Sequence, residues 1–424
     1  MKYSLDDKPK LGTTLLYGLQ WWIVILPSII TMGLVVGKLH YEGDVASQIF
    51  YMQKLFFVLG ITLFVQILWG HRLPLVIGPA SVLLIGILSS FSAGIPAIYT
   101  AVMIGGVLLA IVSASGLLKY LRKIFTSRII AIIMILIPIT LGPTIIRLVF
   151  GNDSSPLFNL GFVVLLSFAL LIINHLSKGI WKSTTLLFGI VIGSLVYYLF
   201  HRHGAEIDIN NTLVNSEKVN LFIRPDFDLG VIFSFLFCAV VLIINEIGSI
   251  ESIGHMLKAD NMEKRNKWGV FFNGLSNILS GSIGVIGSVD YSSSPGMIAS
   301  TRCASRFTFI PAAILLIICA LVPPFIRVLL HIPAIIMGTI LLYVMTTQLA
   351  AGIQIIVRDK AVESFEDGII LGMPIMIALL VSFMPQEASA HIPEILRPIL
   401  SNGFVMGIFS VLILEHLVFR KKVS

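Results

Sequence analysis

The chain has 424 residues, of which 57% are hydrophobic and only 12% are charged, and its mean hydropathy is +0.97. A soluble globular protein carries roughly 25% charged residues, so this composition excludes a soluble domain with an anchor and indicates a polytopic membrane protein. The formal net charge of +7 does not indicate nucleic-acid binding, because Lys and Arg gather in the cytoplasmic loops of membrane proteins.

Apolar stretches that could cross a membrane occur along the whole chain. A span needs about 20 apolar residues, and the pattern predicts one set of elements before the longest polar stretch and a second set after it. The first set is 13–37, 47–69, 74–92, 95–118, 128–150, 157–175 and 183–201. The second set is 229–254, 268–288, 290–300, 307–330, 333–357, 367–385 and 397–419. The sequence therefore predicts an all-α polytopic membrane protein with about fourteen transmembrane segments in two halves.

The third segment of each half is interrupted. Residues 73–84 (LPLVIGPASVLL) and 289–299 (VDYSSSPGMIA) are too short and too rich in Gly, Pro and Ser to be ordinary transmembrane helices. Irregular chain survives at membrane depth only where protein buries it or where it lines a cavity, because hydrocarbon offers no hydrogen-bond partners. Two such breaks at corresponding places are the best sequence pointer to a transporter's substrate site. We expect the two segments to meet, each as a short strand followed by a half-helix.

Positive charge predicts the orientation. If both termini are cytoplasmic, about 21 of the 29 Lys and Arg residues lie on the inner side, which is the asymmetry that the positive-inside rule describes. An odd number of spans would scramble this distribution. The polar stretch at 202–228 then lies outside the cell and links the two halves.

The eighth segment carries ionisable groups, which are costly inside a membrane and are therefore functional candidates. Glu246 and Glu251 are five residues apart, about 140° around a helix, and are not expected to share one face, whereas Glu251 and His255 are four apart and are. A carboxylate at Glu251 could accept hydrogen bonds from substrate N–H groups, take up a proton, or do both. The plainer alternatives are a charge at the helix end that reaches water and an interfacial histidine.

The interrupted segments supply further candidates. Asp290 precedes Ser293 and Ser294 in one break, and Ala80 and Ser81 stand in the other. A half-helix that starts at each break would direct N–H groups with partial positive charge into a cavity, where they suit the oxygens of a polar, planar ligand. Small residues let the two breaks approach closely. The alternative for the serine run is a plain surface loop.

The first predicted span contains Trp21 beside Trp22. An aromatic ring inside a span could form the wall of a pocket for a flat ligand. The alternative is that these rings pack in the core or anchor the span at the membrane interface.

The sequence contains no catalytic or metal-binding pattern. It has no Walker loop, no His-Glu-x-x-His and no nucleophile elbow. Cys238, Cys303 and Cys319 lack metal-type spacing and fit packing positions. We therefore expect neither an enzyme nor a bound cofactor or metal ion.

The string SSPGMIASTRCASR at 293–306 resembles the signature of the nucleobase–cation symporter-2 family, which includes the nucleobase–ascorbate and uracil–xanthine permeases. The positions that fit the spacing of this signature are Gly296, Thr301, Arg302, Ser305 and Arg306. Weaker similarities extend the resemblance over nearly the whole chain. They are Gly18-Leu19-Gln20, Leu73 with Pro74 and Gly78, Glu251-Ser252-Ile253-Gly254, and Asn273-Gly274-Leu275.

The resemblance implies a seven-plus-seven inverted repeat with two domains. A core domain would comprise 13–118 and 229–330, and a gate domain 119–201 and 331–420, with 202–228 as an extracellular linker. It also implies nucleobase uptake coupled to protons, or to sodium in some members, often by a homodimer that would form through the gate domains.

The resemblance also implies roles for the candidate residues. Glu251 would bind the base and couple to the proton. The other substrate-binding candidates are Ala80, Ser81, Ser293, Ser294 and Trp21. The other proton-coupling candidates are His255, Glu246 and Asp290.

Four positions depart from the family pattern. Ser293 replaces a Glu or Gln that binds the substrate, and Ser294 replaces the Asn that follows it. Trp21 replaces a His found in some members, and Ser81 replaces an aromatic residue that stacks on the base. Because hydrogen-bond partners fix specificity, an anion transporter of the sulfate/bicarbonate type with the same fold, or a passive channel, stays open. The sequence favours a proton-coupled symporter of a nucleobase such as uracil, xanthine or a related purine or pyrimidine, in the bacterial plasma membrane.

Overall fold

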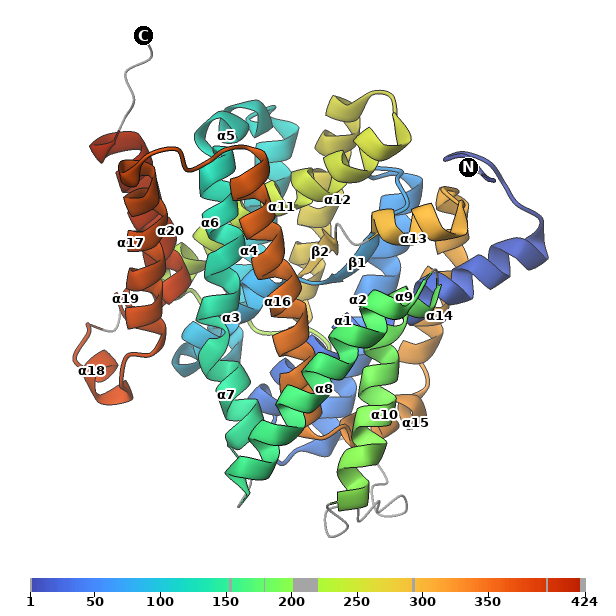
Figure 1. Ribbon diagram of the computed structural model, residues 1–424, viewed down its shortest axis with the longest axis horizontal. Helices are drawn as coiled ribbons and strands as arrows, with labels where there is room; N and C mark the ends of the chain where they lie inside the picture. The colour runs from blue at the N-terminus through green and yellow to red at the C-terminus, as the bar shows by residue number, and fades with distance from the viewer. Residues whose placement is uncertain are drawn as a thin grey trace.

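Figure 1 shows the computed structural model, which describes residues 2–151, 155–178, 180–200, 220–291, 294–393 and 396–419. Within these residues, eight helices are long and apolar enough to cross a membrane. They are α1 (Leu11–His40), α2 (Val45–Leu68), α4 (Ile95–Ala114), the pair α6 (Ser127–Thr140) and α7 (Gly142–Phe150), α8 (Pro156–Leu176), α11 (Leu229–Leu257), α16 (Ala334–Arg358) and α17 (Phe365–Ser382). The predicted multi-pass, all-α membrane fold is confirmed.

The remaining membrane elements are shorter, bent or polar. Helices α14 (Phe309–Ala320) and α15 (Pro323–Leu330) make a ninth candidate span that bends by 82° at a break. The other helices are α3 (Ser81–Ser89), α5 (Leu118–Ile124), α9 (Ile180–Ser183), α10 (Thr185–Phe200), α12 (Met262–Ser282), α13 (Ser294–Thr301), α18 (Gln386–Ala390), α19 (Arg397–Leu400) and α20 (Gly403–Ile413). Most of the predicted linker at 202–228 lies outside the described residues.

Several helices begin at side chains that cap their first turn. The first N–H groups of a helix have no partner within it, so a preceding Asp, Asn or Ser stabilises the start. Asp44 accepts a hydrogen bond from the Ser47 N–H at 3.0 Å before α2, and Asp228 accepts one from the Val231 N–H at 3.0 Å before α11. These polar caps explain why long apolar helices begin where they do.

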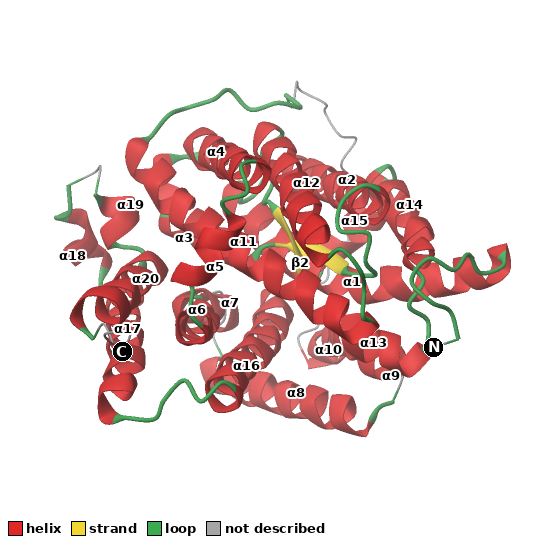
Figure 2. Ribbon diagram, turned by 90° about the horizontal axis from the view of Figure 1, so that it is seen from above, coloured by secondary structure: helices red, strands yellow, loops and turns green. Residues whose placement is uncertain are grey.

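A two-stranded antiparallel sheet lies in the interior of the helix bundle (Figures 1 and 2). Strand β1 (Val76–Pro79) pairs with β2 (Ser288–Tyr291), with Val76 opposite Tyr291 and Pro79 opposite Ser288. The Ala80 N–H continues the pairing by donating to the Gly287 carbonyl at 2.9 Å. The expectation that the two interrupted segments meet, each as a short strand followed by a short helix, is confirmed.

Two groups of helices pack around and beside this sheet. Helix α4 packs against α11 and α12, and α2 packs against α14, close to the strands. Helix α16 packs against α6, α7 and α8, while α17 packs against α20 and α6, to the left of the sheet in the view of Figure 2. The predicted division into a core domain and a gate domain stays a prediction.

Helices α4 and α12 approach each other through glycine. A Cβ atom added at Gly106 would lie 2.6 Å from the Ile278 nitrogen, and one at Gly274 would lie 2.7 Å from the Ala110 nitrogen. No larger residue fits at such a backbone-to-backbone contact. The contact holds α12 closely against α4.

Helix α12 is polar for its position, and this polarity explains why it is not among the eight long apolar helices. Asn273, Ser276, Asn277 and Ser280 on this helix are all buried. The Ser276 hydroxyl lies 2.8 Å from the Ser288 hydroxyl of β2. The polar face of α12 therefore provides hydrogen-bond partners to β2, which would find none in the hydrocarbon of the membrane.

Candidate functional site

The two half-helices begin next to the strand pair, and their first residues are held in place by it. The Ser294 hydroxyl, which is buried, accepts a hydrogen bond from the Val76 N–H at 2.9 Å and so joins the start of α13 to β1. Ala80 is buried, and its carbonyl accepts from the Leu83 N–H at 3.0 Å in the first turn of α3. Ser81, the first residue of α3, is half-buried. Ser293 lies outside the described residues.

Glu246 is the carboxyl group that contacts the strand pair. It is fully buried, and its Oε2 accepts a hydrogen bond from the backbone N–H of Asp290 in β2 at 3.1 Å. Asn273 Nδ2 of α12 donates to the same oxygen at 3.0 Å, and Gln66 Nε2 of α2 lies 3.5 Å from Oε1. Glu246 therefore links α11 to elements from both halves of the chain.

Asp290 faces a histidine that the sequence prediction did not include. His71 Nε2 lies 3.0 Å from Asp290 Oδ2, and both side chains are 1% exposed. His71 Nδ1 accepts a hydrogen bond from the Leu73 N–H at 2.9 Å. In the neutral imidazole the proton must then be on Nε2, the ring nitrogen that lies near the Asp290 carboxylate.

Glu246, Asp290 and His71, which we call the buried triad, place two acids and one imidazole together. The Asp290 backbone N–H bonded to Glu246 and the His71 ring beside the Asp290 carboxylate bring these three residues into one buried site. Among the described residues, no Lys or Arg forms an ion pair with either carboxyl group. Within the same part of the chain, no group of three or more His, Cys, Asp or Glu is arranged to hold a metal ion. The net charge of the buried triad is therefore set by the number of protons that its three side chains hold.

Glu251 lies one to two turns farther along α11 and is half-buried. Asn266 Nδ2 of α12 donates a hydrogen bond to its Oε1 at 3.1 Å. Glu246 is bound by Asn273 of the same helix, and a spacing of seven residues places Asn266 and Asn273 on one face of α12. The two carboxylates, expected on different faces of α11, are thus both bound by α12.

His255 and Trp21 have simpler surroundings. The His255 side chain is exposed near the end of α11. Trp21 is 2% exposed, stacks on Phe309 with ring centroids 4.2 Å apart, and donates from Nε1 to the Thr308 hydroxyl at 3.2 Å. These Trp21 contacts are those of a core residue, and its role as a pocket wall stays a prediction.

Sequence reasoning missed Gln66, His71 and Asn273 because each acts through a partner distant in the chain. A lone His after an apolar span carries no signal of the strand that it will contact. Asn273 stood within a motif of the family resemblance, and this was the one available signal.

The chain is similar to known proteins over nearly its whole length. The chain matches the model of the xanthine/uracil permeases, described as a permease family, over residues 12–387. It is 23% identical to the xanthine permease of Bacillus subtilis, with 95% of this chain and 93% of the relative covered. It is also 23% identical to the uric acid permease PucK of the same species, over 96% of each.

A solved structure supports the fold. The transmembrane domain of the cyanobacterial bicarbonate transporter BicA superposes with a TM-score of 0.66 at 16% identity, and the match covers 89% of this chain and 97% of that one. A likeness at so low an identity shows the fold alone.

Proposed function

Because this chain belongs to the xanthine/uracil permease family, we propose that it carries a purine such as xanthine or uric acid across the plasma membrane together with a proton. It is a membrane transporter and not an enzyme. The observation that carries the proposal is the pairing of β1 with β2, which brings two half-helices and buried acidic groups together inside the bundle. The names of the relatives support the substrate class.

Purine recognition follows from the chemistry of the side chains. Xanthine and uric acid present ring N–H donors beside carbonyl acceptors. The Glu251 carboxylate accepts from a ring N–H, and its bond from Asn266 holds it in place. The N–H groups at the starts of α3 and α13, near Ser81 and Ser294, have partial positive charge that suits the carbonyl oxygens.

Proton coupling rests on the buried triad. Two carboxylates with one imidazole leave a net negative charge at membrane depth, which is costly. A proton taken up by Glu246 or Asp290 reduces this negative charge by one unit, so the protonated carrier moves more easily than the unprotonated one. When the base binds, Glu251 either takes up this proton itself or interacts with the acidic residue that holds it. His255 is exposed, so its contribution would be limited to proton exchange with water.

An anion transporter is the second candidate. Helix N-termini suit anions, and the fold is shared with a bicarbonate transporter. Glu246 and Asp290, both buried at the strand pair, argue against a substrate such as sulfate or bicarbonate that is held by its negative charge alone, because like charges repel strongly where water is excluded. A passive channel would need no buried titratable pair.

The orientation and assembly are part of the proposal. The inner side would be the side that holds most of the basic residues, which places both termini in the cytoplasm. Two copies would associate through the helices of the gate domain.

We expect purified protein to be stabilised against heat by xanthine or uric acid and not by sulfate or bicarbonate. A ligand at 100 times its Kd raises the free energy of unfolding by about 2.7 kcal/mol, which shifts the melting temperature by a few degrees. The measurement is a thermal-shift series over a panel of bases and anions. Stabilisation by the anions alone would contradict the purine proposal and favour the second candidate.

A further inference from the structure

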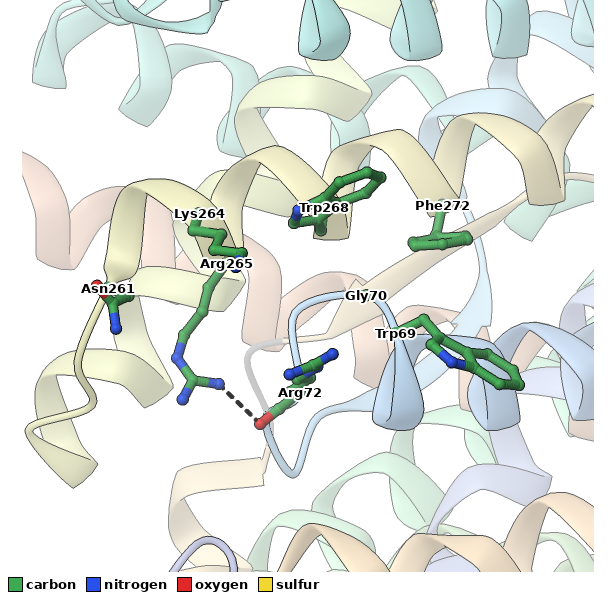
Figure 3. Close-up of a pocket in the computed structure, with 8 residues that line it drawn as sticks. All are labelled: Trp69, Gly70, Arg72, Asn261, Lys264, Arg265, Trp268 and Phe272. Atoms are coloured by element: carbon green, nitrogen blue, oxygen red, sulfur yellow. Dashed lines mark hydrogen bonds between the residues drawn. The ribbon is translucent and has the colours of Figure 1, made fainter.

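A pocket of about 420 Å³ lies between the end of α2 and the beginning of α12 (Figure 3). Its lining combines cationic and aromatic side chains from these two places in the chain. They are Trp69, Arg72, Lys264, Arg265, Trp268 and Phe272. No step of the transport proposal uses this pocket.

The cationic end of the pocket is built around Arg265. Its Nη1 donates to the carbonyls of His71 at 2.9 Å and Arg72 at 3.0 Å, and its Nε donates to the Asp260 carbonyl at 2.9 Å. These bonds hold the α2–β1 loop, in which Arg72 has a φ of 56°. Arg265 therefore stabilises the loop that forms one wall of the pocket.

Arg72 and Lys264 are the cations left to face a ligand. Both are exposed, and within the described residues neither forms an ion pair. Asp6, an acid near this end, binds Arg306 at 2.7 Å instead. The pocket thus has two available positive charges, which match a singly or doubly charged anion.

The other end of the pocket is aromatic and exposed. Trp69 is 53% exposed and Trp268 is 37% exposed. Trp268 and Phe272 lie one turn apart with ring centroids at 5.8 Å, and Leu275, the next residue of this stripe along α12, is 42% exposed. In a membrane protein, exposed aromatic rings beside cations mark the boundary between head groups and acyl chains.

We propose that this pocket binds an anionic phospholipid. Its phosphate lies between Arg72 and Lys264, and an acyl chain follows the apolar stripe from Trp268 toward Leu275. Basic pockets between transmembrane helices on the cytoplasmic side suit acidic head groups. A free phosphate ion would use the cations alone and would gain nothing from the aromatic end, so the combined lining favours the lipid.

The test compares lipid retention by the full chain and by variants in native mass spectrometry. Protein is extracted from nanodiscs that contain equal amounts of phosphatidylglycerol and phosphatidylcholine. We expect phosphatidylglycerol to be retained preferentially, and we expect the double variant Arg72→Gln, Lys264→Gln to weaken its binding roughly 20- to 30-fold, since each cation near the surface contributes about a factor of five.

Two controls are needed. The first distinguishes binding at this pocket from a general effect of surface charge, and the second distinguishes binding of a lipid from binding of free phosphate. Lys119→Gln, Lys360→Gln removes two exposed cations from α5 and the α16–α17 loop, at the same end of the molecule (Figure 1), and should leave retention unchanged. Trp268→Ala should weaken phosphatidylglycerol binding and leave the weak binding of inorganic phosphate unaltered. Equal losses in both double variants, or equal binding of inorganic phosphate and lipid, would overturn the proposal.

Discussion

Replacing Glu251 by Gln is expected to abolish accumulation of the purine. The carboxylate would be lost as an acceptor for the ring N–H and as a group that can change its charge. Each charged hydrogen bond lost weakens binding by roughly 10- to 150-fold. Uptake of labelled xanthine into cells or proteoliposomes, measured at several concentrations, checks this result.

The matched control is Glu263→Gln. Glu263 is an exposed carboxylate in the first turn of α12, close to the Asn266 that binds Glu251. This variant should transport normally. If Glu251→Gln accumulated xanthine as well as the unaltered protein at saturating substrate, Glu251 would have no part in the mechanism.

Replacing Glu246 by Gln is expected to uncouple xanthine transport from the proton gradient. Gln has nearly the shape of a protonated Glu, so the bonds from Asn273 and from the Asp290 N–H can persist, while the side chain can no longer release a proton. Exchange of labelled for unlabelled xanthine should continue. Accumulation driven by a pH gradient should fall to the equilibrium level, and the dependence of uptake on pH should flatten.

Exchange and gradient-driven uptake must be measured on the same proteoliposomes. If exchange and gradient-driven uptake were both lost, Glu246 would have a purely structural role, as the buried hydrogen-bond acceptor that holds β2 in place. Full gradient-driven uptake in Glu246→Gln would remove the buried triad from the coupling step. The conservative variant Glu246→Asp, which can still titrate, should recover part of the pH dependence.

The interrupted segments were predictable because physics leaves few alternatives for them. Gly, Pro and Ser within 73–84 and 289–299 cannot form lipid-facing helices, so burial against each other was the expected outcome. The pairing of Gly78 with Val289 was not predictable. Register depends on contacts between halves of the chain that no local pattern encodes.

The surroundings of the acidic residues were predictable only in part. The cost of inserting a charge into a membrane marks Glu246 and Glu251 as candidates, but their angular separation on α11 does not show which elements contact them. Asn266 and Asn273 of α12 bind one each. His71 reaches Asp290 through the fold, and no spacing in the sequence could have indicated it.

The low hydropathy of α12 has the same cause. A hydropathy count treats its Asn and Ser residues as evidence against a span, whereas the structure buries them against β2 and Glu246. Gly106 and Gly274 permit this placement by letting α4 and α12 touch. The glycines were visible in the sequence, but their contact required knowing which helices are neighbours.

Xanthine uptake into proteoliposomes under an imposed pH gradient, with equal xanthine on both sides at the start, tests proton-coupled purine transport most directly. The buried triad predicts that xanthine rises inside above its outside concentration, and that a protonophore abolishes this rise. Movement of xanthine that never exceeds equal concentrations, whatever the pH gradient, would contradict the account.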